Sequence, residues 1–165
     1  MAIRGRSTLP PQRPGRQTEG VFTRLLVGYD GSPGSRQALR AALRLATGSG
    51  GQVTAVIVQH HLPRYGATVG EVDEERLVEA ADARRLDNEI QAEAAERDLP
   101  VTVRVVTGHP SHELVQAAKD LDADLIVLGH SRHTTLPAAL LGAVTERVSR
   151  HAPCSVLIVR IPALN

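Results

Sequence analysis

The chain of 165 residues has almost no aromatic side chains: it contains no tryptophan, one phenylalanine and two tyrosines. Its hydrophobic core must therefore be built from aliphatic residues. Proteins that bind single-stranded nucleic acid stack bases on exposed aromatic rings, and this sequence offers few such rings. The length suits one domain with a single substantial core.

Lysine is also scarce, since Lys119 is the only one and it lies between Ala118 and Asp120. A P-loop needs a lysine that follows a glycine and precedes serine or threonine, so Walker-type phosphate binding is excluded. No Gly-x-Gly-x-x-Gly run directly follows a predicted strand, which argues against a dinucleotide fold.

The only cysteine, Cys154, has no partner for an internal disulfide, which fits a reducing compartment. We interpret it as a small buried thiol rather than a reactive one. The sequence also lacks an apolar run of membrane-spanning length and the apolar segment of a secretory signal. We therefore expect a cytoplasmic protein.

The net charge of the chain is +1, but the charge is unevenly distributed: residues 1–20 carry +3, and the rest of the chain carries −2. The folded part thus has no basic footprint for duplex nucleic acid. Residues 1–21 combine four arginines and three prolines with few large apolar groups. We expect these residues to form a disordered tail, and residues 22–165 to form the domain.

Beyond residue 23, short apolar runs alternate with segments of helical periodicity. Strands are predicted at 24–29, 53–58, 101–106, 125–128 and 156–160. Helices are predicted at 34–47, 72–97 and 141–150, with another that begins at Pro110. The apolar stripe of the 72–97 segment changes direction, which predicts a bend or an irregular start. Strands separated by helices indicate an α/β fold with an open parallel sheet covered on both faces.

An anion-binding site is predicted where the strand ending at Gly129 leads, through a loop, to a helix beginning near Gly142. Glycine allows close approach of the backbone to a ligand, and the free N–H groups of a first helical turn suit phosphate. The spacing is Gly129, two residues, Arg132, nine residues, Gly142 and Ala143.

This pattern resembles the universal stress protein family, whose nucleotide-binding members carry glycine, two residues, glycine, nine residues, glycine, and then serine or threonine. Gly129 and Gly142 match that motif, whereas Arg132 and Ala143 depart from it. The resemblance spans residues 23–161 and includes the segments Arg24–Ser32, Gly108–Pro110, Asp122–Val127 and Arg150–Val159. It implies a Rossmann-like sheet of five strands in the order 3-2-1-4-5.

That order places a crevice between the first and fourth strands, and Asp30 and Gly129 end these two strands. By resemblance the crevice binds ATP or AMP. The residues expected to bind the nucleotide are Gly28, Asp30, Val58, Leu128, Gly129, Arg132, Gly142, Ala143, Val144 and Thr145. Two residues have open alternatives: Asp30 either contacts the ligand or only organises the turn that follows it, and Arg132 either contacts phosphate or blocks the site.

Histidine is plentiful, with seven residues, but no set of ligands for a metal is complete, and we expect no metal site. His130 or His133 would sooner act as a hydrogen-bond donor near phosphate. No nucleophile elbow or catalytic set occurs, so we do not expect an enzyme.

The leading hypothesis is a stress-response signalling protein that binds an adenine nucleotide weakly. The resemblance also implies a homodimer formed through the last strand (Val156, Leu157, Ile158 and Val159), a long apolar edge that would otherwise be exposed. The alternative is a dimeric interaction module of the same fold without nucleotide.

Overall fold

A computed structural model describes residues 22–59, 69–130 and 142–160, with the backbone alone for residues 69–75. The chain forms strands β1 (Arg24–Gly28), β2 (Gln52–Gln59), β3 (Val101–Thr107), β4 (Leu125–Gly129) and β5 (Ser155–Val159). Between them lie helices α1 (Pro33–Ser49), α2 (Val69–Ala95), α3 (Pro110–Asp120) and α4 (Ala143–His151). The expected tail, residues 1–21, lies outside the described residues.

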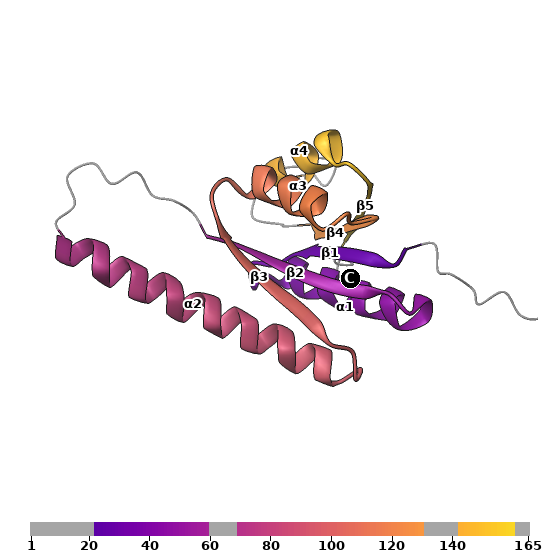
Figure 1. Ribbon diagram of the computed structural model, residues 1–165, viewed down its shortest axis with the longest axis horizontal. Coiled ribbons are helices and arrows are strands. Elements are labelled where there is room, and N and C mark those ends of the chain that lie inside the picture. Colours follow the sequence, from indigo (N-terminus) through magenta and orange to yellow (C-terminus); the bar gives the residue numbers. More distant parts are fainter. Residues whose placement is uncertain (1–21, 60–68, 131–141, 161–165) are drawn as a thin grey trace, which may run out of the picture.

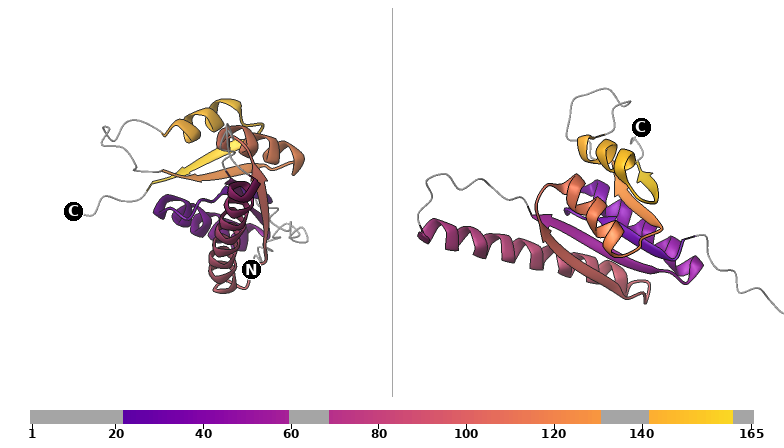
Figure 2. Two further views of the ribbon diagram at one scale, coloured as in Figure 1. Left: turned by 90° about the vertical axis from the view of Figure 1, so that its left-hand side faces the viewer. Right: turned by 45° about the horizontal axis from the view of Figure 1, so that its top comes forward.

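All five strands are parallel, as the sequence pattern predicted, and follow the order β3-β2-β1-β4-β5 that the family resemblance implied. Helices α1 and α2 pack on one face of this sheet, and α3 and α4 pack on the other (Figures 1 and 2). Successive residues of β1 pack on opposite faces of the sheet: Val27 packs with α1 and α2, whereas Leu26 packs with α3 and α4. This arrangement explains why the central strands are apolar throughout.

Local signals set the helix ends. Helix α1 begins at Ser32, whose hydroxyl accepts a hydrogen bond from the Ser35 N–H at 3.2 Å, and ends at Gly50, which is left-handed with φ 68°. Pro110 occupies the first position of α3, as predicted, because its missing N–H is not needed there.

The predicted bend in the 72–97 segment is wrong, because α2 is one continuous helix over Val69–Ala95. Its amino-terminal half projects beyond the sheet in Figure 1. Leu77 and Val78, which suggested the bend, are 72% and 68% exposed. Of the α2 side chains that the structure describes, only Leu86, Ile90 and Ala94 enter the core, so the stripe changes direction where the helix leaves the sheet.

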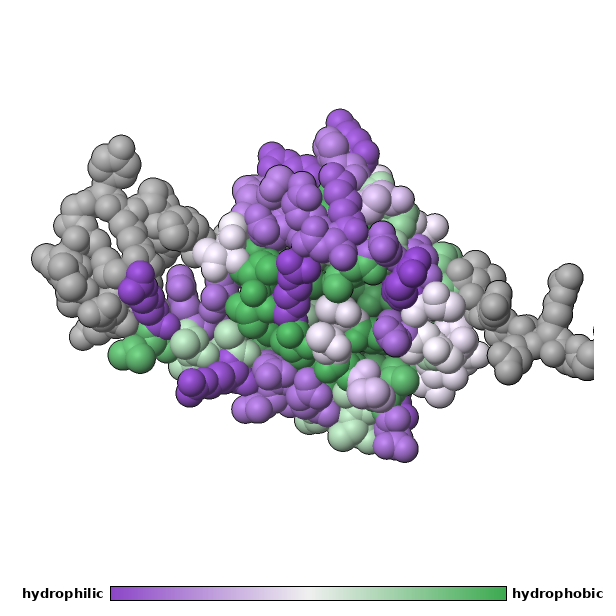
Figure 3. Space-filling model, viewed as in Figure 1, coloured by the Kyte–Doolittle hydropathy of each residue, from purple (hydrophilic) through white to green (hydrophobic). Residues whose placement is uncertain are grey.

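Both edges of the sheet expose an apolar side chain. On β3, which crosses the front of Figure 1, Val105 is 45% exposed, and on β5 Leu157 is 36% exposed. Figure 3 shows apolar side chains gathered in a band across this view, between hydrophilic surfaces above and below. Cys154, predicted to be buried, is half-buried beside the core, and burial raises the pKa of its thiol. None of the helices that the structure describes is long and apolar enough to span a membrane.

Candidate functional site

A cavity of about 620 Å³ lies at the carboxyl ends of β1, β2 and β4. It occupies the switch point of the sheet, where the helices that follow β1 and β4 pass to opposite faces (Figure 2). Every predicted site residue within the described ranges lines it: Gly28, Asp30, Val58, Leu128, Gly129, Gly142, Ala143, Val144 and Thr145. Arg132 lies outside the described residues.

The amino terminus of α4 forms one wall of the cavity. Gly142 precedes the helix with φ −57° and ψ 150°, a conformation open to any residue, and no side chain of the described residues caps the helix. A Cβ at Gly142 would meet nothing nearer than the Thr145 Oγ1 atom, at 3.7 Å. Neither strain nor crowding by described residues therefore requires glycine, and the positive end of the helix faces the cavity.

Gly129 has a packing role that the sequence did not predict. A Cβ there would lie 2.6 Å from the Ser35 nitrogen and still closer to the Gly34 carbonyl group. Because these are backbone atoms at the start of α1, they cannot move aside easily. Glycine at position 129 is thus required for packing between β4 and α1, whether or not a ligand approaches it.

The floor of the cavity is apolar. Val58 and Leu128 line it together with Leu114 from α3. A Cβ at Gly28 would stand 2.8 Å from the Leu128 side chain and 3.3 Å from that of Leu114. Glycine at position 28 therefore makes room for the Leu128 and Leu114 side chains that form this floor.

Asp30 stands at the mouth of the cavity, where it is exposed. Its Oδ1 atom accepts a hydrogen bond from the Ser32 N–H at 3.0 Å, so it does organise the turn into α1. Partial burial raises the pKa of its carboxyl, but hydrogen bonds from Ser32 and Ser35 outweigh burial and lower the pKa below its ordinary value. A carboxylate can accept several hydrogen bonds, so Asp30 can also bind a ligand hydroxyl or amine.

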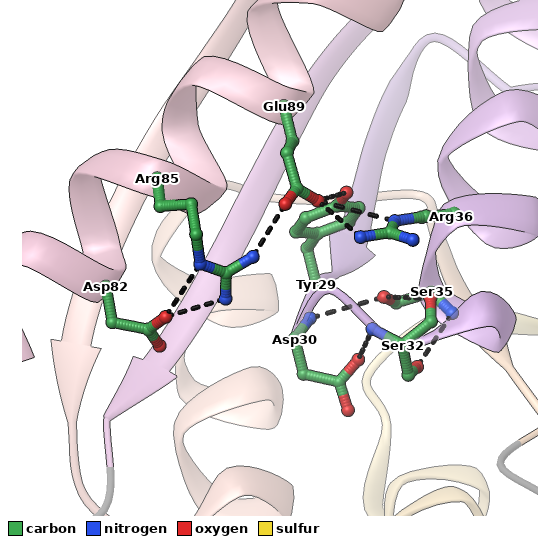
Figure 4. A network of polar contacts seen from close by, with 8 residues as sticks. All are labelled: Tyr29, Asp30, Ser32, Ser35, Arg36, Asp82, Arg85 and Glu89. Carbon is green, nitrogen blue, oxygen red and sulfur yellow. Dashed lines mark hydrogen bonds and ion pairs between the residues drawn. The ribbon is translucent and has the colours of Figure 1, made fainter.

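A polar network anchors the strand end that carries Asp30 (Figure 4). The Tyr29 hydroxyl donates to Glu89 on α2 at 3.0 Å, and Arg36 on α1 donates to the same carboxylate oxygen at 3.0 Å. Burial raises the pKa of Glu89, but the hydrogen bonds from Arg36 and Tyr29 outweigh it and lower the pKa overall. Arg85 bridges Glu89 and Asp82 on α2. The network fixes α2 to the end of β1.

Eight residues that line the cavity were not predicted from the sequence, and His109 and Arg147 are among them. The Arg147 Nη1 and His109 Nε2 atoms lie 3.3 Å apart, and the His109 Nδ1 and Ser111 Oγ atoms lie 3.0 Å apart. Helical spacing could have found Arg147, because it follows Ala143 by one turn on the same face. His109 follows β3 after one intervening residue, Gly108, but no pattern linked it to α4.

The histidines give no metal site in the described ranges, where no three potential ligands cluster. His60, His61 and His133 lie outside these ranges. His130 is described, and its buried Nδ1 atom has no hydrogen-bond partner among the residues that the structure describes.

The chain is similar in sequence to proteins of one known family. A sequence model of the universal stress protein family matches residues 22–160. The universal stress protein MJ0531 of Methanocaldococcus jannaschii is 31% identical over 150 residues, covering 89% of this chain and 87% of that protein.

Solved structures agree with the sequence comparison. Universal stress protein UspA from Lactobacillus plantarum superposes with a TM-score of 0.71 at 25% identity, over 84% of this chain and 98% of that one. A universal stress protein in complex with cAMP superposes with a TM-score of 0.67 at 26% identity, over 84% of this chain and 97% of that one. The protein described here belongs to the universal stress protein family.

Proposed function

We propose that the cavity binds an adenine nucleotide, with the base on the apolar floor, the ribose at Asp30 and the phosphate at the amino terminus of α4. One observation carries this proposal. No described side chain caps the α4 terminus, the glycine that precedes it is not required by any described neighbour, and the terminus shares one cavity with Asp30. The relative solved with cAMP adds support, because it has the same fold.

Binding is proposed to be weak. Ala143 lacks the hydroxyl found in the family motif, and a hydrogen bond to a charged phosphate contributes about 1.5 to 3 kcal/mol. The backbone N–H of Ala143 remains available, and the Thr145 Oγ1 atom faces the end of the helix. Arg132 is proposed to contact phosphate rather than block the site, because a guanidinium matches phosphate oxygens in bidentate fashion.

Calorimetry with ATP and AMP tests this function. Asp30→Asn preserves an oxygen that can accept the Ser32 N–H bond but removes the negative charge, so the turn should persist while nucleotide affinity falls. Asp98→Asn is the matched control, since Asp98 is exposed beyond the end of α2 and does not line the cavity. Equal affinities for wild type and Asp30→Asn would remove Asp30 from the site.

The alternative function, a dimeric interaction module without nucleotide, also has observations in its favour. Two motif positions are altered, and Gly129 is explained by packing alone. Denatured protein analysed by mass spectrometry, together with calorimetry, separates the two functions. Absence of bound nucleotide and of any heat at millimolar ATP and AMP would favour the alternative.

Both proposed functions include a homodimer formed through β5. The strand lies at the edge of the sheet, and Leu157 exposes more than a third of its surface there. An exposed apolar edge is normally paired or covered in a soluble protein. We propose signalling by occupancy of the cavity rather than by catalytic turnover, in the cytoplasm.

A further inference from the structure

The contact between His109 and Arg147 depends on the protonation state of the histidine. A guanidinium group can only donate hydrogen bonds. The His109 Nε2 atom, 3.3 Å from the Arg147 Nη1 atom, must therefore be unprotonated to accept one. The proton of the neutral ring then sits on Nδ1 and is donated to the Ser111 hydroxyl, 3.0 Å away.

We propose that His109 is a second phosphate-binding residue of the cavity, which becomes effective when it is protonated. A proton on Nε2 ends the hydrogen bond from Arg147 and places two positive charges next to each other. Arg147 then turns from His109 toward the ligand, and both groups donate to the phosphate. This inference rests on the proposed nucleotide function and adds a pH dependence to it.

The position of the pair supports this role. Both residues line the cavity, His109 from the start of α3 and Arg147 from the second turn of α4, the helix whose amino terminus is proposed to hold phosphate. Arg147 makes no ion pair with an acid in the described part of the chain, so it is not neutralised there. It is exposed and can reorient.

Other charged or titratable groups on the elements that meet here are His112, Glu113, Lys119 and Asp120 on α3, Glu146, Arg150 and His151 on α4, Tyr29 and Asp30 after β1, and His130 after β4. Glu146 is paired with Arg150 at 2.9 Å, and His151 bonds the Arg147 carbonyl group. The Glu113 carboxylate lies beside Gly108, next to His109. Asp30 stands where the ribose is proposed to bind.

The sign of the effect follows from linkage. A phosphate that binds the protonated form better raises the proton affinity of His109, and a proton strengthens phosphate binding by the same factor. Histidines titrate between about pH 5 and 8, and an exposed charge pair of this kind changes affinity by roughly three- to tenfold.

Cyclic AMP is the probe of choice, because its phosphodiester keeps the same charge over this range, whereas a phosphate monoester such as AMP titrates near pH 6. Adenosine, which lacks phosphate, is the ligand control. The variant is His109→Gln, which stays neutral. His112→Gln is its matched control, since His112 is exposed on the same helix and does not line the cavity.

Calorimetry on the full chain at pH 8 and pH 5.5 gives the test. We expect wild type and His112→Gln to bind cyclic AMP roughly three- to tenfold more tightly at pH 5.5. We expect adenosine affinity to stay constant, and His109→Gln to lose the pH response while its thermal melting is unchanged.

Three results would overturn the role of His109: a wild-type affinity for cyclic AMP that does not change with pH, an equal rise in affinity for adenosine, or a rise in affinity that persists in His109→Gln. None of these results would contradict the nucleotide function. If neither cyclic AMP nor adenosine binds at either pH, while AMP and ATP also give no heat, both proposals fail together.

Discussion

Replacing Gly142 with aspartate should make the protein more stable and its nucleotide binding weaker. Gly142 already has the extended conformation that a helix-capping residue takes, and a Cβ there has no close neighbour among the described residues. An aspartate can therefore accept hydrogen bonds from the N–H groups of Val144 or Thr145. A phosphate is proposed to use these same groups, so the side chain and the ligand compete.

The magnitudes of the effects on stability and on nucleotide affinity can be estimated. Aspartate gains a few tenths of a kcal/mol over glycine as a cap, and its charge beside the helix dipole adds about 0.3 to 1 kcal/mol. In a domain of this size that raises the melting temperature by roughly 1 to 4 °C. Like charges about 5 Å apart repel by roughly 3 kcal/mol at an effective dielectric constant of 20. Screening by solvent and salt reduces this, which leaves a loss of affinity of about tenfold or more.

The assay combines thermal melting of nucleotide-free protein with calorimetry of AMP binding. Gly142→Asn is the control, since asparagine caps the helix without adding charge and should lose less affinity than Gly142→Asp. Unchanged AMP affinity in Gly142→Asp would refute the reasoning, because phosphate could not then lie at the α4 terminus. A lower melting temperature would refute the claim that the position has room for a side chain.

Three further predictions concern the rest of the molecule. Leu157→Asp should convert a dimer to a monomer in light scattering, whereas Val105→Asp at the opposite edge should not; a wild-type monomer at micromolar concentration would exclude the β5 dimer. Gly129→Ala should lower the free energy of unfolding by about 3 kcal/mol in urea titrations, because its Cβ would overlap the backbone of α1; a near-neutral result would contradict the packing role. The lowered pKa values of Asp30 and Glu89 stabilise the fold at pH values above their unfolded pKa values of 3.8 and 4.5. This stability is lost as the pH falls through the lower folded values. Glu89→Gln should therefore flatten the acid limb of a stability profile, and an unchanged limb would argue against the network.

Much of the fold could be predicted from periodicity. The stripe of Leu86, Ile90 and Ala94 identified the buried part of α2, and the unbroken apolar run of β4 identified a central parallel strand. The bend expected near Leu77 failed because sequence gives no measure of how far the sheet extends beneath a helix. Where the sheet ends, an apolar residue can stay exposed without changing the helix.

The candidate site was predictable only where its residues follow one another along the chain. Asp30 and the first turn of α4 directly follow a strand end or a loop, and they line the cavity as expected. The contact of Gly129 with Gly34 joins elements remote in sequence, so packing could not be distinguished from ligand approach. His109 and Arg147 are separated by 38 positions and meet only because α3 and α4 share a face of the sheet.

The central claim is that an adenine nucleotide binds with its phosphate at the start of α4. The most direct test is an NMR titration of isotopically labelled full-length protein with AMP, observing each backbone amide. The account predicts that the largest shifts occur at Ala143, Val144 and Thr145, with a second group at Gly28 and Asp30. Saturating shifts confined to amides outside the cavity, or no shifts at millimolar AMP, would contradict it.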